Sequence, residues 1–362
     1  MRQIIIIGSG PAGYTAAVYA ARANLKPLLI ASSVEAGGEL MNTTEVENFP
    51  GFPEAVMGPD LMFKMQAQAE KFGTEIVLDD VVSVDLTGEV KKVTLGSGAV
   101  HEALAVIFAT GSAYRKLGLA DEERLSGHGV SWCATCDGFF FRQRTIAVVG
   151  GGDSAMEEAT FLTRFADKVY VIHRRDSLRA SKIMQERAFA NDKIEFIWNS
   201  EVIGIGGDEQ VQDVKLRNLV TGEESELHLQ GLFIAIGNDP RVHLIHGQLD
   251  LTAEGTIAVD GRSSKTNLPG VFAAGDVIDP TYRQAVTAAA SGTVAALDAE
   301  HYLTTLPRIC STVQRMARRV ISNSRPPHKE KQKNVSSTFG YGRQLRAGRP
   351  QQREDHPRGL LG

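Results

Sequence analysis

The stretch IIIIGSGPAG at residues 4–13 joins a short run of β-branched apolar residues to a glycine-rich turn. The residues that follow have helical character, and Leu28 to Ile30 form the next apolar run. Gly8 permits a tight turn, Gly10 lets the backbone approach a pyrophosphate, and Gly13 lets the helix pack close to the strand. The order of strand, glycine turn, helix and strand predicts a βαβ unit whose helix N-terminus binds phosphate groups.

A second unit of the same kind occurs in the middle of the chain. TIAVV at residues 145–149 is followed by GGGDSA at 150–155, then by a helical stretch to about Phe165 and an apolar run from Val169 to Ile172. The alanine at the last small position of this turn is one that the fingerprint permits. One glycine turn is weak evidence, but two in this context predict two dinucleotide-binding units.

Each unit is followed by a group of short strands that ends in a similar phrase. The first group ends in Ala109-Thr110-Gly111 and the second in Ala235-Ile236-Gly237. This internal repeat predicts two related Rossmann-like, three-layer α/β domains, the second inserted into the first. The expected limits are 1–112 and 242–306 for the two parts of the outer domain and 113–241 for the inserted domain.

The chain from Pro307 onward differs in composition from the rest. It holds 13 of the 39 Lys and Arg residues but 3 of the 43 Asp and Glu residues, which leaves the remainder acidic at 26 against 40. Residues 307–362 are therefore expected to be a disordered basic tail. Such a tail could bind nucleic acid phosphates, but it has only Phe339 and Tyr341 for base stacking. Nucleic acid is not the expected partner, and a tail without any role is the other alternative.

The overall composition is that of a globular protein, with 43% hydrophobic and 23% charged residues. No apolar run reaches the ~18 to 20 residues of a membrane span. The first strand begins too close to Met1 for a secretory leader. We therefore expect a cytoplasmic protein without a membrane partner.

Three cysteines occur in the chain, Cys133, Cys136 and Cys310. So few are not typical of a secreted disulfide scaffold. In a reducing compartment, the Cys-x-x-Cys spacing of the first two indicates either a redox-active pair or half of a metal site. A metal site needs two further ligands, and the sequence has no second C-x-x-C or H-x-x-x-H pair. We therefore expect a redox-active pair and no metal, with Cys310 a spare exposed thiol.

The residues after the second strand of each unit indicate which dinucleotide binds there, because an acid accepts from a free ribose 2′-hydroxyl and arginines bind a 2′-phosphate. In the second unit this strand is followed by His173, Arg174 and Arg175, with Arg179 one turn later. A guanidinium donates two parallel hydrogen bonds to phosphate. The second unit is therefore expected to bind NADPH, and a solvated basic helix end is the alternative.

The first unit lacks an acid directly after its second strand, where Ile30-Ala31-Ser32 stands, and Glu35 is the nearest candidate. The case for FAD comes from Val271–Asp276, a buried-strand pattern that delivers one carboxylate beside the start of a helix. That carboxylate could bind a ribityl hydroxyl, and the helix dipole would stabilise reduced flavin. The alternative is a core strand that ends in an Asp turn.

Seven motifs together resemble those of the low-molecular-weight thioredoxin reductases, within the pyridine nucleotide-disulphide oxidoreductases. The resemblance covers Met1 to about Leu303. It places the C-x-x-C inside the second nucleotide domain, whereas the larger, glutathione-reductase-like relatives carry their disulfide in the first. In chain order the motifs are residues 8–13, 37–40, 44–51, 133–138, 150–155, 173–175 and 273–276.

The resemblance implies an NADPH-dependent flavoprotein that reduces the disulfide of thioredoxin and forms a homodimer. Cys136 would face the flavin, Cys133 would attack the partner, and Asp137 would be the acid that protonates the leaving thiolate. The implied FAD contacts are Gly8, Gly10, Pro11, Ala12, Gly13, Ser32, Glu35, Gly37, Gly38, Glu39, Asn48, Val81, Asp276, Arg283, Gln284, Ala285 and Val286. The implied NADPH contacts are Gly150, Gly152, Ser154, His173, Arg174, Arg175, Arg179 and Ile236.

The chemistry of these residue types agrees with such roles. C-x-x-C spacing lowers the pKa of one thiol, and exchange passes through a mixed disulfide. A buried carboxylate can move the proton, although a turn or helix-cap role is the alternative for Asp137. A peroxiredoxin, a glutaredoxin-like protein or a small dithiol metabolite is the alternative acceptor.

Two further expectations follow from the resemblance. Glu39 stands where many members carry Gln, which would add charge near the flavin. Nicotinamide and disulfide would share the inserted domain and could not both reach the flavin at once. That domain is therefore expected to swing about linkers near residues 111–116 and 237–243.

Overall fold

The computed structural model describes residues 1–34 and 36–306, and residues 1–306 form one compact unit. A mixed, largely parallel sheet and a fully parallel sheet organise this unit, so the predicted α/β class is correct. The segment 307–362, which includes Cys310, lies outside the described residues, as does Glu35. None of the helices in the described part combines the length and the apolar character needed to cross a bilayer.

The first sheet has seven strands and contains the opening βαβ unit. β1 (Arg2–Ile7) pairs in parallel with β2 (Leu28–Ala31) and with β8 (Val100–Phe108). The four isoleucines of β1 are buried, as expected for a parallel strand that is covered on both faces. The other strands are β5 (Glu75–Leu78), β6 (Val81–Asp85), β7 (Lys91–Leu95) and β19 (Val271–Ala273), which pairs in parallel with β8.

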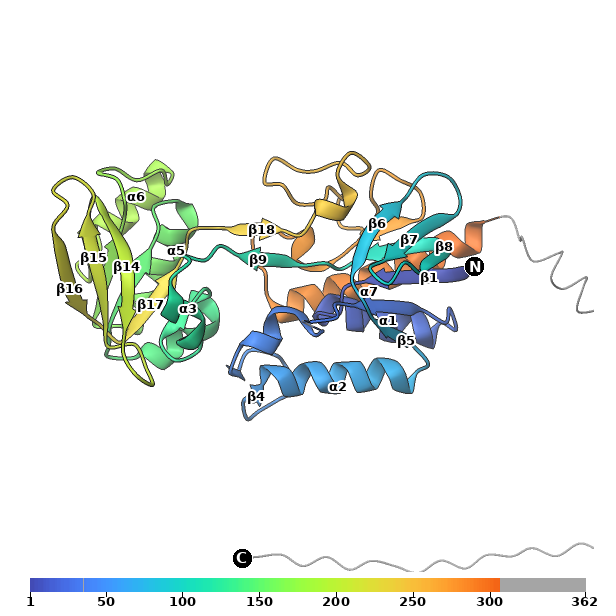
Figure 1. Cartoon of the computed structure of the whole chain (residues 1–362), viewed down its shortest axis with the longest axis horizontal. Coiled ribbons are helices and arrows are strands. Elements are labelled where there is room, and N and C mark those ends of the chain that lie inside the picture. Colours follow the sequence, from blue (N-terminus) through green and yellow to red (C-terminus); the bar gives the residue numbers. More distant parts are fainter. Residues whose placement is uncertain (35, 307–362) are drawn as a thin grey trace, which may run out of the picture. The chain divides into compact units, whose positions relative to one another are not determined.

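Three helices, α1 (Pro11–Arg22), α2 (Gly58–Lys71) and α7 (Ala285–Thr305), contribute to one hydrophobic core of this sheet (Figure 1). A second core on the same sheet takes its partners from residues 242–278. The N- and C-terminal parts of the chain therefore share one domain core. The short elements here are η1 (Gly38–Asn42), β3 (Glu45–Val46), β4 (Val56–Met57), η3 (His243–Ile245) and η4 (Gly275–Val277).

The second sheet has five parallel strands in the order β10-β17-β11-β12-β13. A three-stranded antiparallel sheet packs with it through a shared hydrophobic core. The parallel strands are β10 (Val130–Ser131), β11 (Thr145–Val149), β12 (Lys168–Ile172), β13 (Ile194–Ile197) and β17 (Gly231–Ile234). The antiparallel strands are β14 (Ser200–Gly206), β15 (Asp213–Asn218) and β16 (Glu224–His228). The helices are α3 (Ala120–Arg124), α4 (Ala134–Asp137), η2 (Gly138–Phe141), α5 (Asp153–Leu162) and α6 (Lys182–Phe189).

An antiparallel ribbon of two short strands connects the part with the first sheet to the part with the second (Figure 1). β9 (Ser112–Tyr114) leads out of the first sheet and β18 (Asn238–Pro240) leads back. Tyr114 also stacks on Trp132, with ring centroids 6.2 Å apart. The chain therefore passes between these two parts at β9 and at β18.

Candidate active site

A cavity of about 510 Å³ opens beside the first glycine turn. A Cβ on Gly8, whose φ is +110°, would lie 2.1 Å from the Ala109 carbonyl oxygen, and one on Gly13 would lie 2.0 Å from the Gly8 oxygen. A Cβ on Gly10, in contrast, would have nothing within 4 Å. The turn is thus closely packed except where a pyrophosphate would approach, which fits the predicted dinucleotide.

Most of the FAD contacts predicted from the sequence lie on the wall of this cavity. Three do not: Gly13 packs against Gly8, the space at Gly37 is taken by the Met41 side chain, and Val286 is exposed. Glu35 lies outside the described residues. Those on the wall are Gly8, Gly10, Pro11, Ala12, Ser32, Gly38, Glu39, Asn48, Val81, Asp276, Arg283, Gln284 and Ala285.

Two acids that the sequence reading did not name, Asp79 and Asp80, also line the cavity. The hydroxyl of Ser33 donates to Asp80 Oδ2 at 2.5 Å. This hydrogen bond holds the pKa of Asp80 below its ordinary value. Because β5 pairs in parallel with β2, the acids that follow β5 reach the sheet edge where the first unit needs one. Finding them from sequence requires the strand order.

Asp276 follows β19 and faces the cavity, as expected. Burial raises the pKa of its carboxyl group to about 6, and Asp279 adds to the shift. Arg283 acts in the opposite direction, as does the Ser112 hydroxyl, which donates to Asp276 at 3.4 Å. A half-buried carboxylate with one long hydrogen bond can accept from a ligand hydroxyl.

Glu39 forms an ion pair with Arg241, with 2.7 Å between Oε1 and Nη2, and both residues line the cavity. The backbone of Arg241 is also tied down, because its N–H donates to Gly111 O at 3.0 Å and its carbonyl accepts from Thr110 Oγ1 at 2.9 Å. The charge that Glu39 was expected to add is therefore matched by Arg241. The sequence reading missed this partner, which lies 202 positions away.

The second glycine turn repeats the construction of the first. A Cβ on Gly150 would lie 2.4 Å from the Ala235 oxygen, and one on Gly151 would lie 2.2 Å from the ring of His173. A Cβ on Gly152 would have nothing within 4 Å. This turn, too, is open only where a pyrophosphate would lie, and the residues fit the predicted second dinucleotide.

The basic residues after β12 divide into two kinds. His173 is buried, and its Nε2 lies 3.1 Å from the Ser177 carbonyl oxygen. Burial lowers the pKa of this imidazole, and the charges of the neighbouring arginines lower it further. Arg174, Arg175 and Arg179 are exposed, and the N–H of Arg179 donates to Gly151 O at 2.8 Å. His173 therefore packs under the turn, whereas the guanidinium groups are free to meet a phosphate. Ser154 is exposed and Ile236 is half-buried.

Cys133 and Cys136 form a disulfide at the start of α4. Cys136 and Asp137 line the cavity that holds the first glycine turn. Burial raises the pKa of the Asp137 carboxyl group, although the Ser131 hydroxyl donates to its Oδ2 at 2.6 Å. A carboxyl group whose pKa is raised holds its proton more tightly and can act as an acid beside a thiolate.

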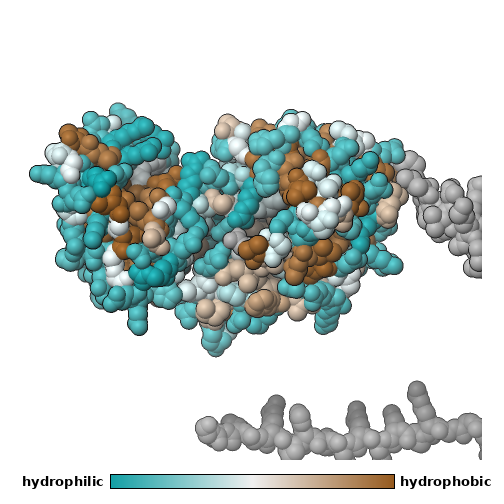
Figure 2. Space-filling model, in the orientation of Figure 1, coloured by the Kyte–Doolittle hydropathy of each residue, from teal (hydrophilic) through white to brown (hydrophobic). Residues whose placement is uncertain are grey.

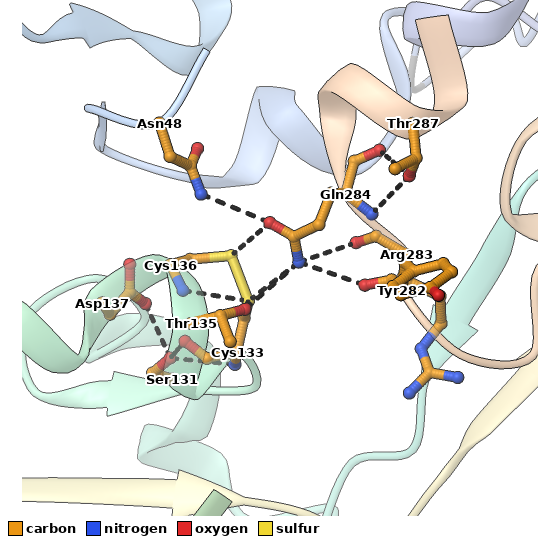
Figure 3. Close-up of a disulfide and its surroundings, with 10 residues drawn as sticks. All are labelled: Asn48, Ser131, Cys133, Thr135, Cys136, Asp137, Tyr282, Arg283, Gln284 and Thr287. Atoms are coloured by element: carbon orange, nitrogen blue, oxygen red, sulfur yellow. Dashed lines mark hydrogen bonds between the residues drawn. A yellow bond between two sulfur atoms is a disulfide. The ribbon is translucent and has the colours of Figure 1, made fainter. Parts of the chain in front are cut away.

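Gln284 reaches the disulfide from the start of α7 (Figure 3). Its Nε2 lies 3.8 Å from Cys133 Sγ and donates to Thr135 Oγ1 at 3.2 Å. Its Oε1 lies 4.0 Å from Cys136 Sγ and accepts from Asn48 Nδ2 at 3.3 Å. Gln284, which was predicted only as a flavin contact, thus also contacts Cys133 and Thr135 of the C-x-x-C segment 133–136.

One cluster of metal-ligand types occurs among the described residues. Asp213, Glu226 and His228 place ligand atoms within 4.8 Å of one another on β15 and β16. Asp213 and His228 are cross-strand partners, so sequence spacing could not reveal the group. Glu226 and His228 are exposed.

Comparisons with known proteins agree with this geometry. The family model of the pyridine nucleotide-disulphide oxidoreductases matches residues 2–292. A thioredoxin reductase of Streptomyces coelicolor is 64% identical over 306 residues, 84% of this chain and 95% of the relative. A Mycobacterium leprae protein named bifunctional thioredoxin reductase/thioredoxin is 54% identical over 84% of this chain and 66% of its own length.

A solved structure is similar as well. The crystal structure of thioredoxin reductase from Streptococcus pyogenes has 45% identity and a TM-score of 0.80, covering 84% of this chain and 98% of that one. Glycine turns, cavity and disulfide all fall within the matched region of the family model. The chain therefore belongs to the pyridine nucleotide-disulphide oxidoreductases and, within them, to the thioredoxin reductases.

Proposed function

We propose that this chain transfers two electrons from NADPH, through FAD and the Cys133–Cys136 disulfide, to the disulfide of thioredoxin. The observation that carries the proposal is one cavity whose wall includes both the first glycine turn and Cys136. A flavin held by that turn would lie against the disulfide. The Mycobacterium leprae relative supports the choice of partner, because its name joins reductase and thioredoxin in one chain. A reducing compartment lets such a pair cycle, and we propose the cytoplasm.

The residues on the cavity wall suit FAD. When bound, FAD supplies a two-electron carrier between nicotinamide and disulfide. We propose that the loop at Gly10 holds the pyrophosphate and that the half-buried carboxylate of Asp276 accepts from a ribityl hydroxyl. For NADPH we propose the second turn at Gly152, with Arg174 and Arg175 on the 2′-phosphate.

The two sulfurs have different surroundings, which supports different roles. Cys136 lines the cavity and Cys133 does not, so we propose that Cys136 receives electrons and Cys133 attacks the partner. The Cys133 thiolate forms a bond to one sulfur of the thioredoxin disulfide, whose second sulfur leaves as a thiolate. Cys136 then attacks Cys133, which restores the internal disulfide and releases reduced thioredoxin. We propose that Asp137, which lines the same cavity as Cys136, supplies or accepts a proton at this sulfur.

We also propose the two-domain division expected from the sequence and a rotation about the β9–β18 ribbon. With the disulfide against the cavity, nicotinamide bound at the second turn has no place beside the flavin. Gly111 and Gly237 have φ of +71° and +111°, one just before β9 and the other just before β18. Residues without a side chain absorb large backbone changes readily, which favours these positions as hinges.

A homodimer is the proposed assembly, and an apolar patch supports it. Tyr19 on α1, Phe63 on α2 and Leu297 on α7 are 43%, 57% and 51% exposed. Figure 2 shows apolar surface over α1 and α2. A twofold dimer would bury the same patch on both copies. Sedimentation should give twice the chain mass, and Phe63→Glu with Leu297→Glu should give the monomer. The control is Val220→Glu, at a residue 76% exposed in the turn between β15 and β16, which should leave the dimer intact.

The experiment that tests the enzyme is NADPH oxidation by the purified yellow protein, with and without oxidised thioredoxin. Turnover that depends on thioredoxin and is lost in Cys136→Ser supports the proposal. If NADPH bleaches the flavin but thioredoxin is not reduced, the partner is wrong. In that case peroxiredoxin, glutaredoxin-like and small disulfides are the acceptors to assay.

A further inference from the structure

Thr135 lies between the two redox cysteines, and the roles described above leave it unassigned. We propose that its hydroxyl donates a hydrogen bond to the Cys133 thiolate and makes Cys133 the more acidic thiol of the reduced pair. The inference rests on the proposed role of Cys133 as the attacking sulfur. It makes Thr135 a further catalytic residue, because its oxygen contacts a reacting atom.

The direction of this hydrogen bond follows from the chemistry of the disulfide. Thr135 Oγ1 lies 3.3 Å from Cys133 Sγ. A sulfur in a disulfide carries no hydrogen, so the hydroxyl is the donor. The same distance suits a hydroxyl that donates to a thiolate once the disulfide is reduced, and sulfur then carries a full negative charge.

Gln284 favours the same direction (Figure 3). Its Nε2 lies 3.1 Å from the Tyr282 carbonyl oxygen and 3.3 Å from that of Arg283, so this end of the amide is the nitrogen. Nε2 donates to Thr135 Oγ1 at 3.2 Å. Because a hydroxyl has one hydrogen and its oxygen already accepts from Gln284, its own hydrogen is free to point at Cys133 Sγ.

The two sulfurs differ in what surrounds them. Cys133 Sγ has a second donor, the backbone N–H of Cys136 at 3.2 Å. Cys136 Sγ faces Gln284 Oε1, an acceptor, at 4.0 Å. Donors stabilise a thiolate and an acceptor oxygen opposes it. The pair of donors therefore lowers the pKa of Cys133 relative to that of Cys136.

The Thr135 contact also survives the proposed domain rotation. Thr135 lies on α4 and Cys133 is the residue that caps its start, so their contact moves with this helix. The contact of Gln284 joins residues 149 positions apart, across the two parts of the molecule, and would be lost. When Cys133 meets the partner's disulfide, Thr135 is thus still beside this attacking sulfur. The hydrogen bond from its hydroxyl then favours the Cys133 thiolate, which is the nucleophile.

The test is the titration of Cys133 alone. In full-length protein with Cys136→Ser and Cys310→Ala, the rate of Cys133 alkylation by iodoacetamide is measured against pH, beside thiolate absorbance. Thr135→Val should raise the apparent pKa by about one unit, which slows alkylation at neutral pH up to about tenfold. Thr135→Ser should keep the parent value because it retains the hydroxyl. Thr221→Val, in the turn between β15 and β16, is the matched control and should also keep it.

Each outcome decides the proposal. An unchanged pKa in both Thr135→Val and Thr135→Ala would overturn it, and so would a rise in Thr135→Ser equal to that in Thr135→Val. An unaltered flavin spectrum in each variant shows that the fold is intact. The readout does not involve thioredoxin, so a shifted pKa combined with no thioredoxin turnover by the protein with both redox cysteines intact would sink the proposed function and leave the Thr135 assignment standing.

Discussion

At the scale of single residues, Asp137 combines burial with a position on the cavity wall beside Cys136. Burial raises its pKa, so the carboxyl group holds a proton at higher pH than an exposed aspartate does. An amide has the same shape but cannot exchange a proton. We expect Asp137→Asn to slow electron delivery to the disulfide by about 10²-fold or more. Stopped-flow absorbance measures this step, and the rate at which NADPH reduces FAD should be unchanged as a control. If the variant reduced the Cys133–Cys136 disulfide at the parent rate, Asp137 would not be the acid.

The exposed arginines after β12 carry the second prediction. Loss of both guanidinium groups in Arg174→Ala with Arg175→Ala should raise the KM for NADPH by about 10- to 100-fold, because each charge-assisted hydrogen bond to phosphate contributes up to about 3 kcal/mol. The KM for NADH should change little, since NADH has no 2′-phosphate. Steady-state kinetics with both cofactors checks this. Arg217→Ala, an exposed arginine on β15, is the control. Equal losses with NADPH and NADH would contradict the assignment.

Asp276 has a pH signature of its own. Its pKa is raised to about 6 by burial, so the neutral form is favoured in the folded protein. Folding therefore gains free energy from protonated Asp276. This contribution to the free energy of unfolding is complete below the unfolded pKa of about 4 and is lost as pH rises through about 6. In the flavin-free protein, Asp276→Asn should therefore be more stable than the parent at pH 8, by up to about 3 kcal/mol, and no more stable at pH 4. Urea unfolding at the two pH values measures the difference, and a pH-independent difference would argue against a half-buried, titrating carboxyl.

At the scale of elements, α7 crosses α1 so closely that Gly292 has no room for a side chain. A Cβ there would lie 2.2 Å from the Ala12 carbonyl oxygen. Alanine in a helix is normally about 1 kcal/mol more favourable than glycine, but here the clash should outweigh this. We expect Gly292→Ala to destabilise the protein by about 1 to 3 kcal/mol. Thermal unfolding checks the sign, with the exposed Ala290→Ser as control.

The strands divide into those that local patterns predict and those that they do not. β11 has the predicted ends, Thr145 and Val149, because a β-branched run followed by a glycine turn defines it locally. β19 is only Val271–Ala273 within the predicted buried-strand pattern Val271–Asp276. The extent of β19 depends on its pairing with residues 106–108 of β8, which are distant in the chain. β9 and β18 were not predicted as strands, because neither has an apolar pattern and each is ordered by the other.

At the scale of the whole molecule, the proposed rotation requires the two parts to separate in every cycle. Arg283 interacts electrostatically with Glu158 on the other part. A short bis-maleimide bridge between Arg283→Cys and Glu158→Cys, in a Cys310→Ala protein with the redox pair oxidised, should abolish thioredoxin reduction. Each single variant treated with a monofunctional maleimide is the control. Full turnover in the bridged protein would refute the rotation.

The amino-acid sequence by itself determined the α/β class, the two glycine turns, the redox pair and the basic cluster after β12. Each depends on residues that are neighbours in the chain, so local sterics and spacing suffice. Only the tertiary structure decided that Asp80 accepts from Ser33 and that Arg241 pairs with Glu39. It also decided that Gln284 contacts the C-x-x-C segment 133–136. These contacts depend on strand order and on the register of the ribbon. Both are set by packing among residues tens to hundreds of positions apart, which no local pattern encodes.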